Sequence, residues 1–402
     1  MLFAFVVFAI VFMESLFSSV SFRSVESETQ IKRTAHQGLK IIDEEVQQVV
    51  LKEESFPKRV EEADYGTRNT DSNATVLERK VSLLKKKKLS KRKLNTLTTS
   101  QKAGEFDSRV DAFLHNRGLR CQIQIFLTWI SPAKSFQGRQ FLVLDSLFKN
   151  NPNACLVILS KELDSGPGRL ILKPLLDHGY RVAAFDPDLK SLFKNTPAEA
   201  WLKDIQGGHK DAGGIPLAQN LSNLMRLAAL YKYGGVYLDT DFIVLRDLSG
   251  LRNTIGAQSM DRNGKWTRLN NAVLIFDKNH PLLYEFMKEF QRNFDGSKWG
   301  YNGPYLVSRV IERVTKQKRY NFTVLPPKAF YPVDWTRIDG FFKRPNDPGF
   351  VKWAEAKLLR LKKGNETYGI HLWNRQTGRM KIEKGSIMSE LISHHCIICP
   401  KH

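Results

Sequence analysis

The chain has 402 residues, enough for one large domain or two smaller ones with accessory segments. Its 42% hydrophobic and 11% aromatic content suits a globular protein with a sizeable core. A formal net charge of +21 would suit nucleic acid or an anionic membrane, but no basic motif with interleaved aromatic residues accompanies it, so nucleic acid is not an expected partner.

Two segments precede the predicted catalytic domain. Residues 1–22 begin with an unbroken apolar run over 2–13 and carry one charged residue, Glu14; because a bilayer span needs about 20 apolar residues, they fit either a signal-anchor or a cleaved signal peptide. Residues 23–115 are charged, poor in aromatic residues and basic over 85–93. They therefore cannot bury enough apolar surface to offset the conformational entropy lost on folding. We interpret them as a low-complexity lumenal stem with a glycosylation sequon at Asn73; a nuclear signal or nucleic-acid arm is the alternative reading of the basic cluster.

Strand and helix patterns alternate in the first part of the remaining chain, residues 116–402. Strands are expected over residues 121–129, 156–159 and 181–185. Helices are expected over residues 140–149 and 170–178, and a glycine-rich loop over 197–214. This alternation predicts an α/β sheet with ligands beyond the carboxyl ends of its strands. Thr128 and Trp129 occupy such an end, where Trp129 either stacks on a uracil ring or packs in the core.

The stretch from residue 218 to 246 has the clearest pattern. Apolar residues recur every three or four positions from Leu221 to Tyr231, which predicts a helix with one buried face. Gly234 and Gly235 end that helix, since glycine takes the left-handed conformation without steric penalty. A short apolar strand then leads to Asp239-Thr240-Asp241.

Two carboxylates at i and i+2 project to the same side of an extended chain. Asp239 and Asp241 would be costly to bury as bare anions, and a hard divalent cation such as Mg²⁺ or Mn²⁺ neutralises them and brings a substrate diphosphate with it. The alternative is a pair of solvated turn aspartates, but the helix, the two glycines and the apolar strand favour the metal site.

Polar residues in the C-terminal part suggest further contacts. Asn270 and Asn271 lie in a predicted strand with a polar end, where they would face a bound substrate, or else serve turn chemistry. Residues 299–304, Trp-Gly-Tyr-Asn-Gly-Pro, precede a predicted helix, and their glycines would let a substrate approach the backbone. Residues 368–374 read as a strand of period two, so His371 and Trp373 would share a face.

The cysteines are Cys121, Cys155, Cys396 and Cys399. They permit one or two disulfides, with the connectivity left open. Zinc binding by the C-terminal cysteines and histidines is the alternative, but ligands crowded into the last residues form a poor tetrahedral cage. We expect disulfides.

Residues 220–241 carry a resemblance to a known family. Asn-Leu-Ser-Asn-x-x-Arg, followed by Leu-Tyr-x-x-Gly-Gly-x-Tyr-Leu-Asp-x-Asp, resembles the lactosylceramide 4-α-galactosyltransferase-like (Gb3 synthase-like) group of DXD glycosyltransferases, family 32, in its plant-type branch. The resemblance runs from about residue 122 to 399. It implies an α/β, GT-A-like nucleotide-sugar-binding domain with a mixed central sheet flanked by helices, divided into a donor-binding part (116–250) and an acceptor or C-terminal part (251–402).

The resemblance also implies an activity. It points to transfer of galactose from UDP-galactose, with retention, to a glycolipid or glycan acceptor by a type II protein of the Golgi membrane. The implied cofactor is Mn²⁺, with Mg²⁺ as the alternative, because Mn²⁺ tolerates imidazole better. An inactive lectin-like relative and a phosphatase with an Asp-x-Asp motif are the competing classes, although phosphatases place that motif near the start of their domain.

Specific roles follow from the same resemblance. The implied metal ligands are Asp239, Asp241 and His371. The implied donor-binding residues are Thr128, Trp129, Arg226, Tyr237, Asp239, Asn270, Asn271 and Trp373. The implied catalytic residues are Asp239, Asp241 and Asn223. Many relatives carry aspartate where this chain has Asn223, so an anionic role at that position is in doubt.

Overall fold

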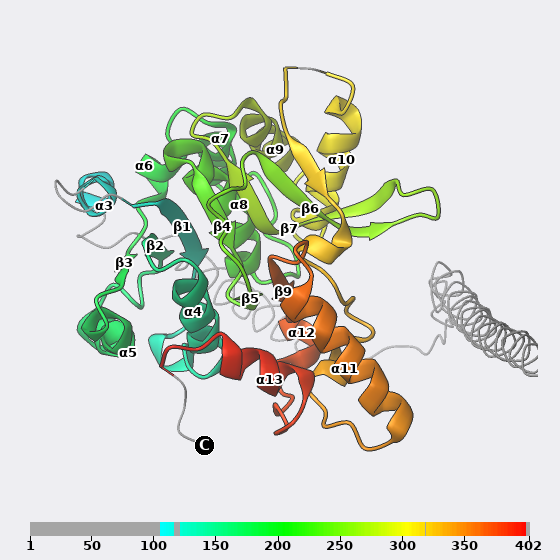
Figure 1. Ribbon diagram of the computed structural model, residues 1–402. Coiled ribbons are helices and arrows are strands. Elements are labelled where there is room, and N and C mark those ends of the chain that lie inside the picture. Colours follow the sequence, from blue (N-terminus) through cyan, green and yellow to red (C-terminus); the bar gives the residue numbers. More distant parts are fainter. Residues whose placement is uncertain (1–104, 116–120, 318, 399–402) are drawn as a thin grey trace, which may run out of the picture. The chain divides into compact units, whose positions relative to one another are not determined.

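The computed structural model describes residues 105–115, 121–317 and 319–398 (Figure 1). The chain divides into two units, residues 1–76 and 77–402, and every described residue belongs to the second. The predicted membrane segment, most of the predicted stem and Asn73 lie outside the described residues. No helix among the described residues is long and apolar enough to span a bilayer.

A mixed sheet forms the centre of the second unit. Its strands are β1 (Ile123–Thr128), β2 (Ala154–Leu159), β3 (Arg181–Phe185), β4 (Gly235–Leu238), β6 (Thr254–Met260), β7 (Trp266–Phe276) and β8 (Thr323–Leu325). They lie in the order β3-β2-β1-β4-β7-β6-β8. The first four are parallel to one another, whereas β7 is antiparallel to β4 and β6. A second, two-stranded sheet pairs β5 (Phe242–Val244) with β9 (Gly369–His371).

Helices cover both faces of the large sheet (Figure 1). The longer ones are α3 (Phe106–Leu114), α4 (Arg139–Asn150), α5 (Gly166–Asp177), α7 (Pro197–Gln206), α8 (Leu217–Tyr233), α9 (Pro281–Arg292), α10 (Pro304–Val314), α11 (Pro348–Lys363) and α13 (Ile387–His394). The short ones are α6 (Leu189–Phe193), α12 (Asn374–Thr377) and the 3-10 turns η3 (Ala133–Ser135), η4 (Pro327–Ala329) and η5 (Ile338–Phe341).

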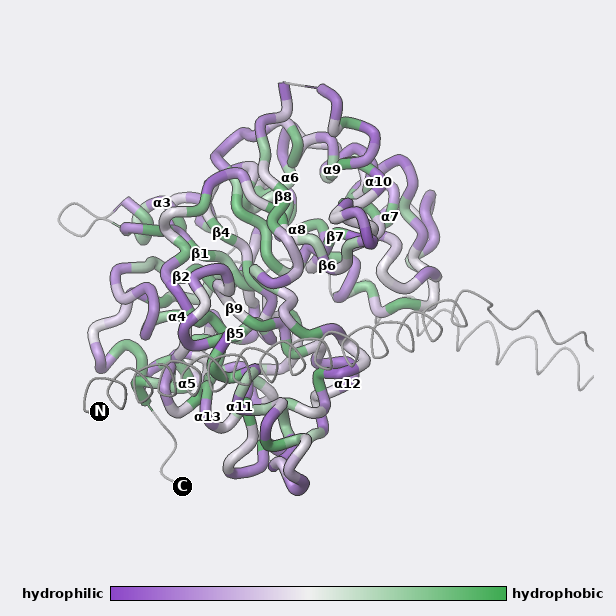
Figure 2. The backbone as a smooth tube through the Cα atoms, turned by 45° about the vertical axis from the view of Figure 1, so that its right-hand side comes forward, coloured by the Kyte–Doolittle hydropathy of each residue, from purple (hydrophilic) through white to green (hydrophobic). Residues whose placement is uncertain are grey.

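Alternate residues of a strand face opposite sides of the sheet, and this divides the core. Phe126 of β1 packs in one cluster with α3 and α6 to α10, while its neighbours Ile125 and Leu127 pack in another with α4 and α5. A third cluster joins the small sheet to α11 and α13. Figure 2 shows the apolar segments running through the centre and the hydrophilic ones at the periphery. The predicted fold class, an α/β domain with a mixed central sheet flanked by helices, is confirmed.

The helix predicted in the central stretch is α8, and it ends at the predicted glycines. Gly234 and Gly235 have φ of +73° and +105°. A Cβ atom on Gly235 would lie 2.4 Å from the carbonyl oxygen of Gln124 in β1. Glycine at this position therefore lets β4 lie against β1, and β4 in turn presents the two aspartates.

Three expectations were wrong. Residues 197–206 form α7 and not a loop, because Trp201 and Ile205 lie on an apolar face that the core buries. The predicted stem includes α3, whose Phe106 packs into the core, so the globular unit begins before residue 116. The strand expected over 368–374 ends at His371, and Trp373 adopts a left-handed conformation with φ of +53°.

The expected pairing of cysteines is confirmed. Cys121, just before β1, is bonded to Cys155 in β2, and Cys396 is also disulfide-bonded. The Cys121–Cys155 bond joins two neighbouring parallel strands at their amino-terminal ends.

Candidate active site

The two aspartates lie at the carboxyl edge of the parallel strands. Because β1 and β4 are parallel, Thr128 at the end of β1 and Asp239 after β4 reach the same edge. The backbone N–H of Asp239 donates to the carbonyl of Ala272 in β7 at 2.8 Å. This edge is where an α/β sheet binds ligands, as expected from the sequence.

His371 reaches the aspartates from the C-terminal part of the chain. β9 pairs with β5 so that His371 lies opposite Phe242, the residue that follows Asp241. His371 Nε2 is 3.2 Å from Asp241 Oδ1. One ligand atom from each of Asp239, Asp241 and His371 lies within 4.8 Å of the other two, so the fold brings together the three residues predicted to bind a metal.

These three side chains fit a divalent cation. Two carboxylate oxygens suit Mg²⁺ or Mn²⁺, and one imidazole favours Mn²⁺ of the two. The side chains of Asp241 and His371 are 12% and 10% exposed, whereas that of Asp239 is 28% exposed. The site is therefore shielded from solvent at Asp241 and His371 and accessible beside Asp239. A diphosphate could complete the coordination of the cation there.

Burial and neighbouring charges set the protonation of this group. Burial raises the pKa of Asp239, and the nearby guanidinium of Arg226 offsets this only in part. Burial acts in the same direction on Asp241, but His371 and the backbone N–H of Asn374 outweigh it and hold the pKa of Asp241 below its usual range. Burial would lower the pKa of His371, but Asp241 outweighs it and the pKa is raised.

The raised pKa of His371 predicts pH-dependent metal binding. A metal ligand must be unprotonated, so affinity is complete above the raised pKa and is lost as the pH falls through it. Mn²⁺ affinity, measured by titration between about pH 8 and about pH 6, should fall towards tenfold per unit at the acid end. His371→Gln should bind Mn²⁺ more weakly and with a flatter profile. An unchanged slope in this variant would assign the titration to another group.

Arg226 on α8 holds Asp239 in place. Its Nη2 is 3.1 Å from Asp239 Oδ1, and its Nη1 is 3.4 Å from Oδ2. Nη1 also donates to the carbonyl of Asn271 at 2.7 Å, while Nε and Nη2 donate to the carbonyl and hydroxyl of Ser222. The guanidinium lies 4.4 Å from the ring centre of Tyr237. All three guanidinium nitrogens are therefore engaged by protein acceptors, which favours a positioning role for Arg226 over the predicted direct donor contact.

Tyr237 and Thr128 belong to the same network. The hydroxyl of Tyr237 donates to Asp239 Oδ1 at 3.0 Å and lies 2.8 Å from Thr128 Oγ1. Tyr237 is fully buried and Thr128 is 8% exposed. Both residues, predicted to contact the donor, are thus placed to orient Asp239.

The predicted asparagines form a second polar group next to this network. Asn271 Nδ2 donates to Asn223 Oδ1 at 2.9 Å, and a Cβ atom on Gly303 would lie only 3.0 Å from that oxygen. Asn270 lies apart: it donates to Gln258 and accepts from the backbone of Ala272. Asn223 and Asn271 therefore border the site, whereas Asn270 chiefly braces β6 and β7.

A pocket of about 260 Å³ lies at the carboxyl ends of β1, β2 and β3. Its lining includes Trp129, Leu159, Ser160, Asp186, Leu221 and Met225. Leu221 and Met225 belong to α8 and directly precede Ser222 and Arg226. The same helix, α8, therefore lines this pocket and places Arg226 against Asp239.

Two residues in this pocket bear on nucleotide binding. Trp129 is half-buried, with its ring edge-on to Phe136 at 5.0 Å. Asp186 is 4% exposed, and within the described chain its Oδ2 has no hydrogen-bond partner. Asp186 was not among the predicted site residues, although a polar residue directly after a predicted strand was the available signal.

Trp373 and Asn374 support the metal-binding group, as we call Asp239, Asp241 and His371. The Trp373 ring lies edge-on to His371 at 4.4 Å, and its indole N–H donates to the carbonyl of Val333. The backbone N–H of Asn374 donates to Asp241 Oδ2 at 2.9 Å. Trp373 thus contacts the imidazole, and no sequence signal pointed to the backbone of Asn374.

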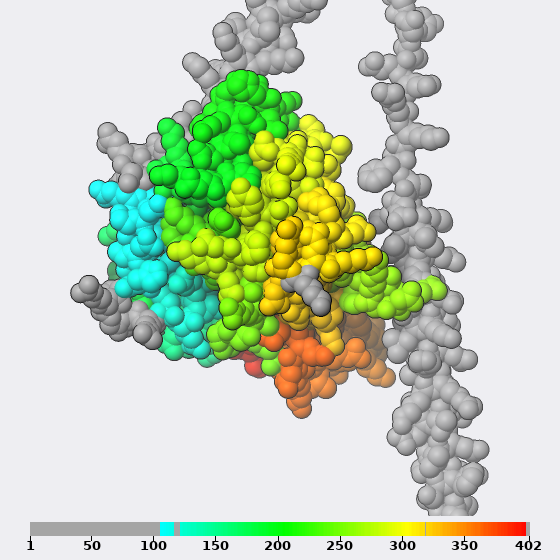
Figure 3. Space-filling view, turned by 90° about the horizontal axis from the view of Figure 1, so that it is seen from above, coloured from blue at the N-terminus to red at the C-terminus, as the bar shows by residue number. Residues whose placement is uncertain are grey.

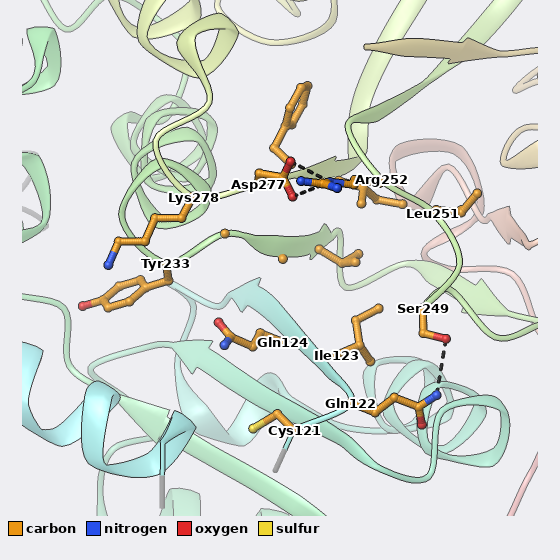
Figure 4. Close-up of a pocket in the computed structure, with 15 residues that line it drawn as sticks. Cys121, Gln122, Ile123, Gln124, Tyr233, Ser249, Leu251, Arg252, Asp277 and Lys278 are labelled. Atoms are coloured by element: carbon orange, nitrogen blue, oxygen red, sulfur yellow. Dashed lines mark hydrogen bonds and ion pairs between the residues drawn. The ribbon is translucent and has the colours of Figure 1, made fainter. Parts of the chain in front are cut away.

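A larger pocket, of about 400 Å³, lies at the opposite edge of the sheet (Figure 4). It is lined by the first residues of β1 and β4 and the last residues of β7, with Arg252 and Asp277 ion-paired at 2.8 Å. None of the predicted site residues lines it. It is therefore separate from the candidate active site.

Comparison with known proteins agrees with this geometry. The family model described as "Glycosyltransferase sugar-binding region containing DXD motif" matches residues 139–261, and "Alpha 1,4-glycosyltransferase conserved region" matches residues 275–402. The human lactosylceramide 4-alpha-galactosyltransferase is 30% identical over 265 residues, which cover 63% of this chain and 69% of that protein.

Two other similarities are less complete. An uncharacterized protein of Arabidopsis thaliana is 32% identical over 301 residues, 73% of this chain, and the chain spans 44% of its length. The solved PaToxG glycosyltransferase is 15% identical with a TM-score of 0.35, covering 76% of this chain and 96% of that one. That TM-score is too low to support a fold assignment. The assignment therefore rests on the sheet topology described above.

Proposed function

The chain belongs to the α1,4-glycosyltransferase family with a DXD sugar-binding region, and so to the hexosyltransferases, and we propose that it transfers galactose from UDP-galactose to a glycolipid or other glycan acceptor with retention. The observation that carries the proposal is the convergence of Asp239, Asp241 and His371 beside an open pocket at the carboxyl edge of the sheet.

Each residue of the group has a distinct task in this proposal. Asp239, Asp241 and His371 would hold Mn²⁺, or Mg²⁺ in its place. When bound, that cation supplies charge stabilisation for the departing diphosphate. Arg226 and Tyr237 orient Asp239, while the backbone N–H of Asn374 orients Asp241. This preorganisation matters because fixed polar groups stabilise developing charge without reorganising during the reaction.

The pocket beside Trp129 would receive the uracil. The indole face offers a stacking surface for the ring, and Asp186, which also lines the pocket, would turn a carboxyl oxygen towards the N3–H of uracil. A carboxylate with an unused lone pair in a buried site is costly, and such a hydrogen bond would relieve the cost.

The reaction at the sugar would proceed on one face. Asn223 and Asn271 border the site of Asp239 and Asp241. Their side-chain amides are hydrogen-bonded to each other and are poor nucleophiles. This supports departure of UDP and attack by the acceptor from the same side, without a covalent intermediate. Position 223, where many relatives carry aspartate, therefore has an uncharged amide side chain in this protein.

We further propose the Golgi membrane as the site of action, with the N-terminal segment as a type II anchor and the catalytic unit in the lumen. The Cys121–Cys155 disulfide supports an oxidising compartment. Protease protection in intact Golgi vesicles tests this; digestion of the catalytic unit without detergent would place it on the cytoplasmic side.

A donor panel tests the proposed activity. UDP-galactose, UDP-glucose, UDP-N-acetylglucosamine and GDP-mannose are offered with Mn²⁺ and a membrane glycolipid extract, and transfer from UDP-galactose is expected to be fastest. Transfer from GDP-mannose alone would contradict the donor assignment. Mn²⁺-dependent UDP binding without transfer from any donor would favour an inactive relative, and hydrolysis of a generic phosphate ester would favour a phosphatase.

Substitutions in the base pocket give a further prediction. Trp129→Ala should raise the KM for UDP-galactose by roughly tenfold, the loss of about 1–1.5 kcal/mol of stacking. Asp186→Asn should also raise it, because its amide offers the N3–H one acceptor and one misplaced donor. Trp353→Ala, an exposed tryptophan of α11, is the control. An unchanged KM in both pocket variants would place the base elsewhere.

A further inference from the structure

We infer that the acceptor is a saccharide carrying an anionic group and that it binds across an aromatic surface next to the metal-binding group. This inference rests on the proposed transferase function. The acceptor surface, as we call it, consists of Trp299, Tyr305, Arg268 and Arg375.

The acceptor surface begins at the candidate active site. Arg375 directly follows Asn374, whose backbone N–H is bonded to Asp241, and its guanidinium lies 4.1 Å from the ring centre of Trp299. A Cβ atom on Gly300 would lie 3.1 Å from the ring of Tyr305, so the residue next to Trp299 contacts that ring. A chain of contacts therefore leads from Asp241 through Arg375 and Trp299 to Tyr305.

Its other end lies on β7. The guanidinium of Arg268 is 4.8 Å from the ring centre of Tyr305. Arg268 belongs to the hairpin of β6 and β7, which extends away from the body of the unit (Figures 1 and 3). The loop between Trp299 and Tyr305 also packs against the site, since Gly303 abuts the pair of Asn223 and Asn271. A ligand on this surface would thus lie within reach of a sugar held at the metal.

The two aromatic residues of the surface are exposed. Trp299 is 47% and Tyr305 is 41% exposed, although large aromatic side chains gain most when they are covered. The C–H face of a pyranose is apolar and flat, and it excludes water from such a ring while its hydroxyl groups remain hydrated. This matches a glycan better than a wholly apolar partner.

The two arginines specify the charge of that glycan. Among residues 105–115, 121–317 and 319–398, no ion pair joins Arg268 or Arg375 to a carboxylate. Arg309 makes a similar contact, 4.1 Å from the ring centre of Tyr301, but it is paired with Glu289 at 3.1 Å. A guanidinium fork suits a carboxylate or a phosphate. An acidic sugar or a sugar phosphate on the acceptor would supply that anion.

Binding of matched disaccharides tests the inference. The wild-type protein, with Mn²⁺ and UDP present, is titrated with cellobiose, with its uronic acid cellobiouronic acid, and with cellobiose 6′-phosphate. At least one acidic probe should bind about tenfold more tightly than cellobiose, as expected for charge-assisted hydrogen bonds. Preference for the carboxylate probe indicates an acidic sugar, and preference for the phosphate probe indicates a sugar phosphate.

Variants separate charge from stacking. Arg268→Gln combined with Arg375→Gln should bring the ratio of acidic to neutral affinity close to one. Trp299→Ala should weaken all bound probes by a similar factor and leave the ratio unchanged. The matched controls are Arg252→Gln, an exposed arginine at the opposite edge of the sheet, and Trp353→Ala, whose ring is 40% exposed on α11; both should bind as the wild type does.

The inference is overturned if the wild type binds no acidic probe more tightly than cellobiose, including the case in which it binds none, or if the preference survives the double arginine substitution. A parallel titration of the wild type with UDP and Mn²⁺ separates this failure from that of the proposed function. Absence of UDP binding would refute the donor site itself, whereas UDP binding without any acidic preference would refute the acceptor surface alone.

Discussion

Asp241→Asn is expected to lower hexosyl transfer by roughly a thousandfold or more. Asp241 is the more buried of the two aspartates: His371 Nε2 approaches one of its oxygens at 3.2 Å, and the backbone N–H of Asn374 bonds the other at 2.9 Å. An amide can keep the second contact only in part and supplies no charge. Several kcal/mol of transition-state stabilisation would be lost, and each ~1.4 kcal/mol is a factor of ten in rate.

The measurement pairs transfer rate with UDP binding. In Asp241→Asn, Mn²⁺ should no longer strengthen UDP binding, while the protein still unfolds cooperatively. Asp177→Asn is the control, since Asp177 is an exposed partner of Lys173 one helical turn away and such pairs contribute little. If Asp241→Asn kept Mn²⁺-dependent UDP binding, the metal-binding group would have to be sought elsewhere.

Arg226→Met should reduce both stability and activity. Arg226 is 5% exposed, and its loss leaves the carboxylate of Asp239 without its cation. Removing one partner of a buried pair costs roughly 3–5 kcal/mol, and because Asp239 is 28% exposed we expect about 3 kcal/mol, the lower end. Denaturant unfolding without added metal measures this loss.

A double variant separates positioning from direct donor binding. Adding Asp239→Asn to Arg226→Met removes the unpaired carboxylate, so a part of the lost stability should return while transfer stays abolished. Arg309→Met, which disturbs the ion pair between α10 and the buried Glu289 of α9, should lose stability but keep Mn²⁺-dependent UDP binding. If Arg226→Met were as stable as the wild type and only bound UDP less tightly, Arg226 would be a direct donor ligand.

The acceptor surface and the metal-binding group make different demands on a substrate. The metal-binding group would recognise a diphosphate, which both UDP-sugars and GDP-sugars carry, whereas Trp299, Tyr305 and their two arginines would select among glycans. Specificity for the acceptor would then depend on side chains of α12, β7, α10 and the loop before α10. These segments are distant in the sequence and meet only in the folded structure.

The sequence by itself determined the local parts of this protein. The spacing of leucines along α8, the two glycines and the short apolar strand were enough to predict a helix, its end and the position of Asp239 and Asp241, because helix periodicity and left-handed glycines are properties of a few neighbouring residues. The first three strands were also predicted, because alternating or continuous apolar runs are likewise patterns of a few neighbouring residues.

Tertiary structure decided what those residues contact. Pairing of β9 with β5 brings His371 beside Asp241, and hydrogen bonds to Ser222 and Asn271 engage Arg226 within the protein. The course of Trp373 and the burial of Asp186 are likewise set by segments distant in sequence. Such contacts depend on which surfaces meet when the core packs, and that information is spread over the whole chain and not held in any one motif.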